Sequence, residues 1–143
     1  MPLPQELIEA FRQAIYLVNA EESIAVRIDH PSDQLQQLLI KHNAQTAAII
    51  TADNPRSQLL PDDVNRLAEE QLRSLLQKDS FRFLKTIHRD IGSKWPDEHG
   101  FLVFDLPRER LDHLLVEFGQ LAAVTIDSAG NPSLLFSLVD SDA

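Results

Sequence analysis

Residues 47–51, with the sequence Ala-Ala-Ile-Ile-Thr, constrain the fold more than any other part of the chain. The run is apolar up to its last residue, and polar residues bound it on both sides. A half-exposed strand alternates apolar and polar side chains, whereas a strand buried on both faces is a continuous apolar run. We therefore expect 47–51 to be a central strand, covered on both of its faces.

The order of the other elements predicts the fold class. Apolar spacing predicts helices over 5–14, 32–43, 62–78 and 107–119, and strands at 14–18, 23–28, 81–88, 101–106, 122–126 and 134–139. With 47–51 included, the order is αββαβαββαββ, in which strands come in adjacent pairs. This order predicts an α+β fold with a mixed, mostly antiparallel sheet and helices packed mainly on one face. The length of 143 residues is that of a single domain, residues 1–143.

Composition excludes several classes of function. The chain has a formal net charge of −9, so it repels the backbone of nucleic acids. No apolar run approaches the ~20 residues that span a bilayer, and the first residues lack the basic and apolar regions of a signal peptide. There is no cysteine, which rules out disulfides and Cys-ligated zinc. We expect an acidic cytoplasmic protein with no cofactor, no nucleic-acid partner and no membrane partner.

The segment 51–58 is the first candidate for a binding site. It leaves the most apolar strand and runs toward a helix, a place where ligands often bind. Thr51 and Asn54 supply hydrogen-bonding groups, and Arg56 can bind a carboxylate or a phosphate. The alternative is a simple turn, because Asn-Pro is common in loops and an Asn side chain often bonds its own backbone.

The segment 92–100 is the second candidate and contains the single tryptophan, Trp95. A Trp in a polar loop either covers the core or stacks on a ligand. Glu98 is a possible general base in a suitable environment, whereas the acidic and His residues at 97–99 are consecutive and are not expected to converge on a metal ion. We expect this loop to meet the loop 52–58, with the indole N–H bonded to an acceptor at residues 51–54.

Five short motifs in sequence order carry a family resemblance. They are Tyr16; Ile50, Thr51, Ala52, Asn54, Pro55 and Ser57; Asn65; Trp95, Pro96 and Glu98; and Phe118, Gly119 and Gln120. Over residues 15–126 the chain resembles a bacterial family known as domain of unknown function 3293 (DUF3293). The resemblance implies no activity, but its motif residues are mostly polar or aromatic and fall at strand ends and loops. The chain departs from the family at Asp53, often aromatic there, and at Pro61, often Ser.

Two functions remain open at this point. The first is a polar pocket for a small anionic or amide-bearing ligand at the end of the central strand. Its candidate residues are Thr51, Asn54, Arg56, Asn65, Trp95, Glu98 and Gln120. The second is a protein-interaction or regulatory module without catalysis. Because no known catalytic motif is present, the sequence favours binding over catalysis and assigns no catalytic residue; ligand identity and oligomeric state stay open.

Overall fold

The structure, a computed structural model, describes residues 3–137. Its helices are α1 (Gln5–Gln13), α2 (Asp33–Lys41), α3 (Asp62–Lys78) and α4 (Arg108–Glu117), with a 3-10 turn, η1 (Pro55–Ser57). Its strands are β1 (Ile15–Val18), β2 (Ile24–Val26), β3 (Ala47–Thr51), β4 (Phe83–Arg89), β5 (Glu98–Phe104), β6 (Ala122–Ile126) and β7 (Pro132–Phe136). The predicted element order is confirmed. Residues 138 and 139 of the last predicted strand lie outside the described residues.

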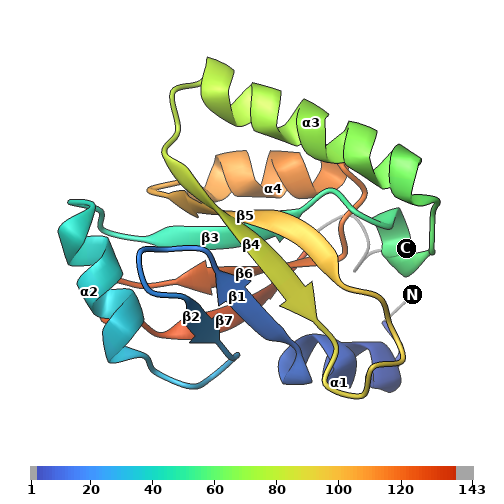
Figure 1. Ribbon diagram of the computed structural model, residues 1–143, viewed down its shortest axis with the longest axis horizontal. Helices are drawn as coiled ribbons and strands as arrows, with labels where there is room; N and C mark the ends of the chain where they lie inside the picture. The colour runs from blue at the N-terminus through green and yellow to red at the C-terminus, as the bar shows by residue number, and fades with distance from the viewer. Residues whose placement is uncertain (1–2, 138–143) are drawn as a thin grey trace.

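The seven strands form one sheet in the order β2-β1-β4-β5-β3-β6-β7 (Figure 1). β3 lies between β5 and β6, and all five of its residues are buried, as its continuous apolar run predicted. The α+β class is confirmed, but the expected mixed sheet is antiparallel at every described pairing. Three of the six pairings join strands that are consecutive in the chain, and such hairpins are antiparallel by construction.

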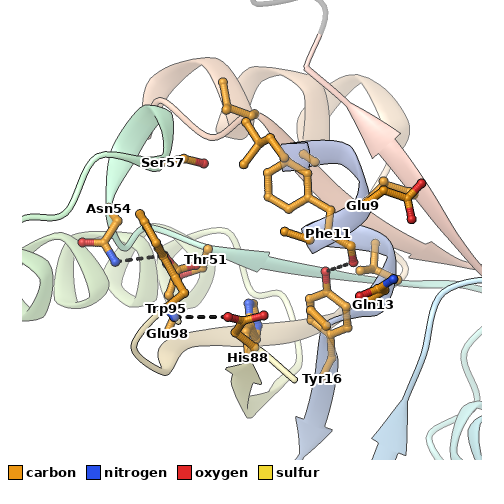
Figure 2. A pocket seen from close by; sticks show the side chains of 18 of the residues that line it. Glu9, Phe11, Gln13, Tyr16, Thr51, Asn54, Ser57, His88, Trp95 and Glu98 are labelled. Atoms are coloured by element: carbon orange, nitrogen blue, oxygen red, sulfur yellow. Dashed lines mark hydrogen bonds between the residues drawn. The ribbon is translucent and has the colours of Figure 1, made fainter. Parts of the chain in front are cut away.

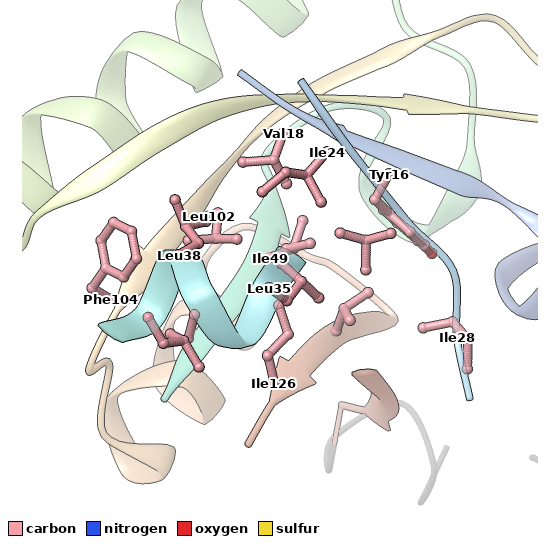
Figure 3. Packing of buried hydrophobic residues seen from close by; sticks show 14 residues of the cluster. Tyr16, Val18, Ile24, Ile28, Leu35, Leu38, Ile49, Leu102, Phe104 and Ile126 are labelled. Carbon is pink, nitrogen blue, oxygen red and sulfur yellow. The ribbon is translucent and has the colours of Figure 1, made fainter. Parts of the chain in front are cut away.

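Helices cover both faces of the sheet, which differs from the expected packing on mainly one face. α3 and α4 lie together over the outer face, which carries Ile50. α2 packs against the inner face, which carries Ile49 (Figure 3). The reason lies in β3 itself, because a strand that is apolar on both sides needs a covering layer on each.

The sheet curls so that β1 and β2 pack opposite β3 and β6 around the inner core. α2 fills one end of this curl with three buried leucines, Leu35, Leu38 and Leu39, and the Ser32 hydroxyl caps it by accepting the Leu35 N–H. α1 covers the other end, yet none of its residues is buried. The two ends of the curl are therefore packed very differently, and the unfilled end holds the candidate site.

α3 has the predicted bounds but is rotated from the predicted orientation. Helical spacing of the apolar residues predicts Val64 and Leu67 in its core face, but their side chains are 44% and 62% exposed. Asn65 is buried instead, along with Leu72 and Leu76. The cause is a hydrogen-bonded contact of Asn65 with the loop that follows β3, described below. No helix in residues 3–137 is both long enough and apolar enough to cross a lipid bilayer.

Candidate functional site

The register of three neighbouring strands places three polar side chains in one row. Tyr16 of β1 pairs with His88 of β4, and His88 pairs with Glu98 at the start of β5. A cavity of about 700 Å³ lies over this row, between the inner face of the sheet and α1 (Figure 2). Leu7, Ala10 and Phe11 contribute to its wall from α1, and Leu121 and Val124 from the β6 region. The cavity is thus largely apolar, with a few polar groups converging on it, as ligand sites usually are.

The chain leaving β3 is fixed to β5 by short polar contacts. Thr51 Oγ1 donates to the His99 carbonyl at 2.6 Å and accepts the Asp53 N–H at 3.0 Å. The Asp53 carboxylate accepts the His99 N–H at 2.9 Å. Asn54 then adopts a left-handed conformation (φ 47°, ψ 60°), which Asn tolerates better than most residues, and Pro55 starts η1. These contacts turn the Asn54 side chain toward Glu98.

Asn54 and Asn65 form a buried, reciprocal pair. Asn65 Oδ1 accepts the Asn54 backbone N–H at 2.9 Å, and Asn65 Nδ2 donates to Asn54 Oδ1 at 2.8 Å. Asn54 Oδ1 also accepts the Leu60 N–H at 2.9 Å. With its oxygen fully used, the orientation of the Asn54 amide is determined, and its Nδ2 is directed at the cavity floor.

Glu98 receives that amide group and a second donor. Asn54 Nδ2 donates to Glu98 Oε2 at 2.9 Å, and Trp95 Nε1 donates to the same oxygen at 3.1 Å (Figure 2). Trp95 is itself positioned by its backbone N–H, which Asp90 accepts at 3.1 Å. Both donors use Oε2, so the carboxylate is oriented while Oε1 accepts no hydrogen bond from residues 3–137.

The turn after α4 supports the same loop from the other side. Gly119 has a φ of +63°, and a side chain there would approach Pro55 Cβ to 3.0 Å. Its carbonyl accepts the Arg56 N–H at 2.7 Å. Gln120 Nε2 donates to the Asp53 carbonyl at 3.0 Å and to the Phe118 carbonyl at 3.2 Å. Gln120 therefore mainly stabilises the loop that follows β3, although it also borders the cavity.

Burial shifts the protonation of the groups around this floor. Desolvation raises the pKa of Glu98, while the hydrogen bonds from Asn54 and Trp95 oppose the rise. Desolvation also raises the pKa of Asp53 to about 7, with neighbouring Glu69 adding to the effect. His88 has its pKa lowered to about 3 by burial, so it is neutral at physiological pH. His88 therefore places no positive charge beside the Glu98 carboxyl group on the floor.

The structure brings together most of the residues predicted from the sequence. Five of the seven candidates line the cavity: Thr51, Asn54, Trp95, Glu98 and Gln120. Asn65 does not line it and acts from behind by holding Asn54. Arg56 also lies outside the lining, so the basis for expecting an anion is not part of this cavity. The two loops do meet, but the acceptor of the Trp95 indole is Glu98 of its own loop rather than the 51–54 corner.

Sequence reasoning missed the contribution of β1, β4 and α1 to the site. In the sequence Tyr16 is only a motif residue, and His88 is one of several scattered histidines that lack the spacing of metal ligands. Their rings meet edge to face with centroids 4.9 Å apart. His88 also lies so close to Gly100 that a Cβ there would be 2.9 Å from its Nε2. The signal available in the sequence was weak, because only the strand order makes β1 and β4 neighbours of β5.

A sequence model of the family described as protein of unknown function (DUF3293) matches residues 50–123, slightly more than half of the chain. The chain belongs to the DUF3293 family. The matched segment contains all seven candidate residues, whereas Tyr16 and α1 lie before it. Comparison with curated proteins and with solved structures finds no match in either set. The resemblance inferred from the sequence is thus confirmed at the level of the family.

Within this DUF3293 chain, the departure at Asp53 does not alter the cavity wall. Asp53 is buried at 3% exposure, bonds to β5 and is not among the lining residues. Residues 3–137 contain no cluster of three or more His, Asp or Glu side chains that could hold a metal ion. What the arrangement offers chemically is an oriented carboxylate at the bottom of a largely apolar cavity, with aromatic rings beside it. It suits the binding of a hydrogen-bond donor.

Proposed function

We propose that the protein binds a small, largely apolar molecule in the cavity beneath α1, and that Glu98 orients the polar end of that molecule. The single observation that carries this proposal is the arrangement at Glu98. Two side chains from different loops orient its carboxylate through one oxygen, and the other oxygen has no partner in residues 3–137. A network of Thr51, Asn65 and Gln120 supports these loops from behind. Such support for a single carboxylate is typical of binding sites.

The cavity has the properties that small-molecule sites need. Its volume of about 700 Å³ falls within the usual range for such sites. Its wall from α1 consists of side chains that are only partly buried, Leu7 and Phe11 among them. An apolar ligand would cover this surface and gain the free energy of burying it. Binding without catalysis is sufficient to account for these features.

A thermal-shift screen tests the proposal. Wild-type protein is heated with a panel of metabolites, each compared with the variant Ala10→Trp, which places an indole in the cavity wall. A true ligand at about 100 times its dissociation constant adds ~2.7 kcal/mol of stability to the wild type and should have little effect on the variant. Ala129→Trp adds the same side chain at an exposed turn and should retain the shift. Shifts that persist in Ala10→Trp would contradict binding in this cavity.

One feature of the structure supports the alternative function, a protein-interaction module. Leu59, Val64 and Leu67 are exposed by 59%, 44% and 62% at the start of α3 and in the loop before it. Exposed apolar groups of this kind are common at protein contacts. None of these three residues lines the cavity, so this surface is a second and separate candidate.

We further propose that the protein works in the bacterial cytoplasm. A chain without cysteine has no disulfide that this reducing compartment could break.

A further inference from the structure

We propose that the ligand of this cavity is an amine, and that its ammonium group binds to Oε1 of Glu98 while its apolar body lies beneath α1. This inference rests on the proposed function, because it names the chemical class of the molecule that the cavity holds. It replaces the anion expected from the sequence with a cation. The argument depends on the partners of Glu98, on the charges around the cavity and on the aromatic rings beside the carboxylate.

The first step concerns the two oxygens of Glu98. Asn54 and Trp95 both donate to Oε2, and both donors are neutral. They orient the carboxylate without compensating its charge. Glu98 lines the cavity, and its Oε1 accepts no hydrogen bond from residues 3–137. A partly buried carboxylate that lacks a positive partner gains most from a donor that carries charge.

The second step concerns the cations that could otherwise pair with Glu98. Within residues 3–137 no Lys, Arg or His forms a salt bridge with it. Arg89 borders the cavity but is bound by both oxygens of Asp97, at 3.2 Å and 2.9 Å. His88, the closest basic side chain by register, is neutral because burial lowers its pKa. Lys94 also borders the cavity, with its side chain at the exposed rim.

The third step concerns the charge of the cavity as a whole. Glu6 and Glu9 of α1 and Asp90 border it in addition to Glu98. These carboxylates outnumber the two lining cations, one of which is already paired. The field inside such a cavity attracts a positive group and repels a negative one. An anionic ligand would meet this field at the rim and an unpaired carboxylate at the floor.

The fourth step concerns the aromatic rings around the floor. Tyr16, Phe11 and Trp95 all line the cavity, and Figure 2 shows their rings on different sides of the space near Glu98. A cation that lies over aromatic faces is stabilised by the negative potential of the rings. A carboxylate and several aromatic rings around one space form a site for an ammonium group. The apolar wall beyond, with Leu121 and Val124, suits the rest of an amine such as an arylalkylamine.

The test compares amines with matched alcohols and acids. 2-Phenylethylamine, 2-phenylethanol and phenylacetate are titrated into the protein at pH 7.5, together with the larger pair tryptamine and tryptophol. Binding is followed by calorimetry and, for the phenyl compounds, by the fluorescence of Trp95, which is the only tryptophan in the chain. We expect each amine to bind at least about tenfold more tightly than its alcohol, and phenylacetate to bind most weakly.

Two variants locate the source of the preference. Glu98→Gln keeps an acceptor for Asn54 and Trp95 but removes the charge, so the preference for the amine should fall to about twofold or less while the alcohol still binds. Glu109→Gln removes the same charge from an exposed position on α4 and should leave the preference unchanged. Circular dichroism and thermal melting establish that each variant is folded. If Glu98→Gln fails to fold, amide proton shifts of the wild type with each amine locate the site instead.

Each possible result decides between the two proposals. If amines and alcohols bind equally to the wild type, or if Glu98→Gln retains the preference, the ammonium site is wrong and the binding cavity stands. If the wild type binds none of the five compounds, the amine inference fails, and the thermal-shift screen with Ala10→Trp decides the proposed function separately. Tighter binding of phenylacetate than of the amine would restore the anionic ligand and overturn this inference alone.

Discussion

The two ends of the curled sheet are each covered by a helix of nine residues, and the two helices differ in how they pack against the sheet. α2 inserts three leucines into the inner core, together with residues of β2, β5 and β6 (Figure 3). α1 has an apolar face of its own, with Leu7, Ile8 and Phe11, but buries none of its residues and leaves about 700 Å³ beneath it. One end is packed like a protein interior and the other is not.

The difference indicates that the α2 end contributes mainly to stability and the α1 end mainly to ligand binding. A domain of this size gains most of its stability from a filled core, which the α2 end and the outer face supply. The α1 end lacks that packing, and oriented polar groups lie at the floor of its cavity instead. Binding sites are commonly built at such a cost to stability. The comparison predicts which substitutions should affect folding and which should affect the ligand.

The largest effect on stability is expected at the α2 end. Leu39→Ala removes a side chain that is 2% exposed and leaves a cavity in the inner core. Its free energy of unfolding should fall by about 3 kcal/mol, within the 2–5 kcal/mol usual for such changes. Chemical denaturation followed by circular dichroism measures it. A loss below about 1 kcal/mol would show that the α2 end is no better packed than the α1 end.

A smaller loss is expected where the polar network supports the site. Asn65→Ala removes the acceptor of the Asn54 N–H and the donor to Asn54 Oδ1, both in buried surroundings. Unpaired buried groups cost about 1–3 kcal/mol, so stability should fall by about 2 kcal/mol. Ligand binding should weaken as well, because Asn54 then no longer fixes Glu98. Gln77→Ala, at an exposed position on the same helix, should change neither quantity.

The loop behind the site contains a buried acid, Asp53, which makes stability depend on pH. The pKa of Asp53 is raised from 3.8 to about 7, so the folded protein holds this proton more tightly than the unfolded chain does. Its contribution to stability is therefore complete below about pH 4 and is lost as the pH rises through about 7. Asp53→Asn keeps an acceptor for the His99 N–H and cannot ionise. It should be more stable than the wild type by about 1–2 kcal/mol at pH 8.

Denaturation at several pH values tests the sign of this effect. The advantage of Asp53→Asn should shrink as the pH falls and approach zero below about pH 4, where Asp53 becomes protonated in the unfolded chain as well as in the folded protein. Glu22→Gln changes the net charge equally at an exposed position and should show no such trend. A difference between Asp53→Asn and the wild type that does not vary with pH would mean that Asp53 titrates normally.

The smallest effect on stability is expected in α1. Phe11→Ala shortens a half-buried side chain that already faces the cavity, so unfolding should become easier by only about 1 kcal/mol or less. The affinity for a ligand of the cavity should nevertheless drop, since Phe11 forms part of its wall. Calorimetric titration of any compound that emerges from the screen measures this. A stability loss as large as that of Leu39→Ala would contradict the contrast between the two ends.

Much of the fold was predictable from local patterns. The order of the helices and strands, the bounds of α3 and the burial of β3 follow from apolar spacing and loop residues. Helical spacing also puts the three leucines of α2 on one face of that helix, which the structure buries. The meeting of the loops after β3 and before β5 was also predicted, because a buried central strand and a long loop carrying Trp95 pointed to one edge of the sheet.

Errors arose where a long-range contact outweighed a local pattern. In α3 the apolar side chains of Val64 and Leu67 suggested the core face, yet a hydrogen-bonded pair with Asn54 turns Asn65 inward instead. Arg56 was expected in the pocket because of its charge and its place in the loop. The left-handed turn of η1 puts it outside the cavity lining.

The sequence alone determined the elements and the polar groups that could form a site, because helical and strand periodicity and loop chemistry are local properties. Only the tertiary structure decided that Tyr16, His88 and Glu98 stand in one row, since that row depends on pairings between strands far apart in the chain. It also decided that α1 covers a cavity while α2 fills a core. Both helices are amphipathic, and which of them finds a complementary surface depends on how the sheet curls, which no local pattern encodes.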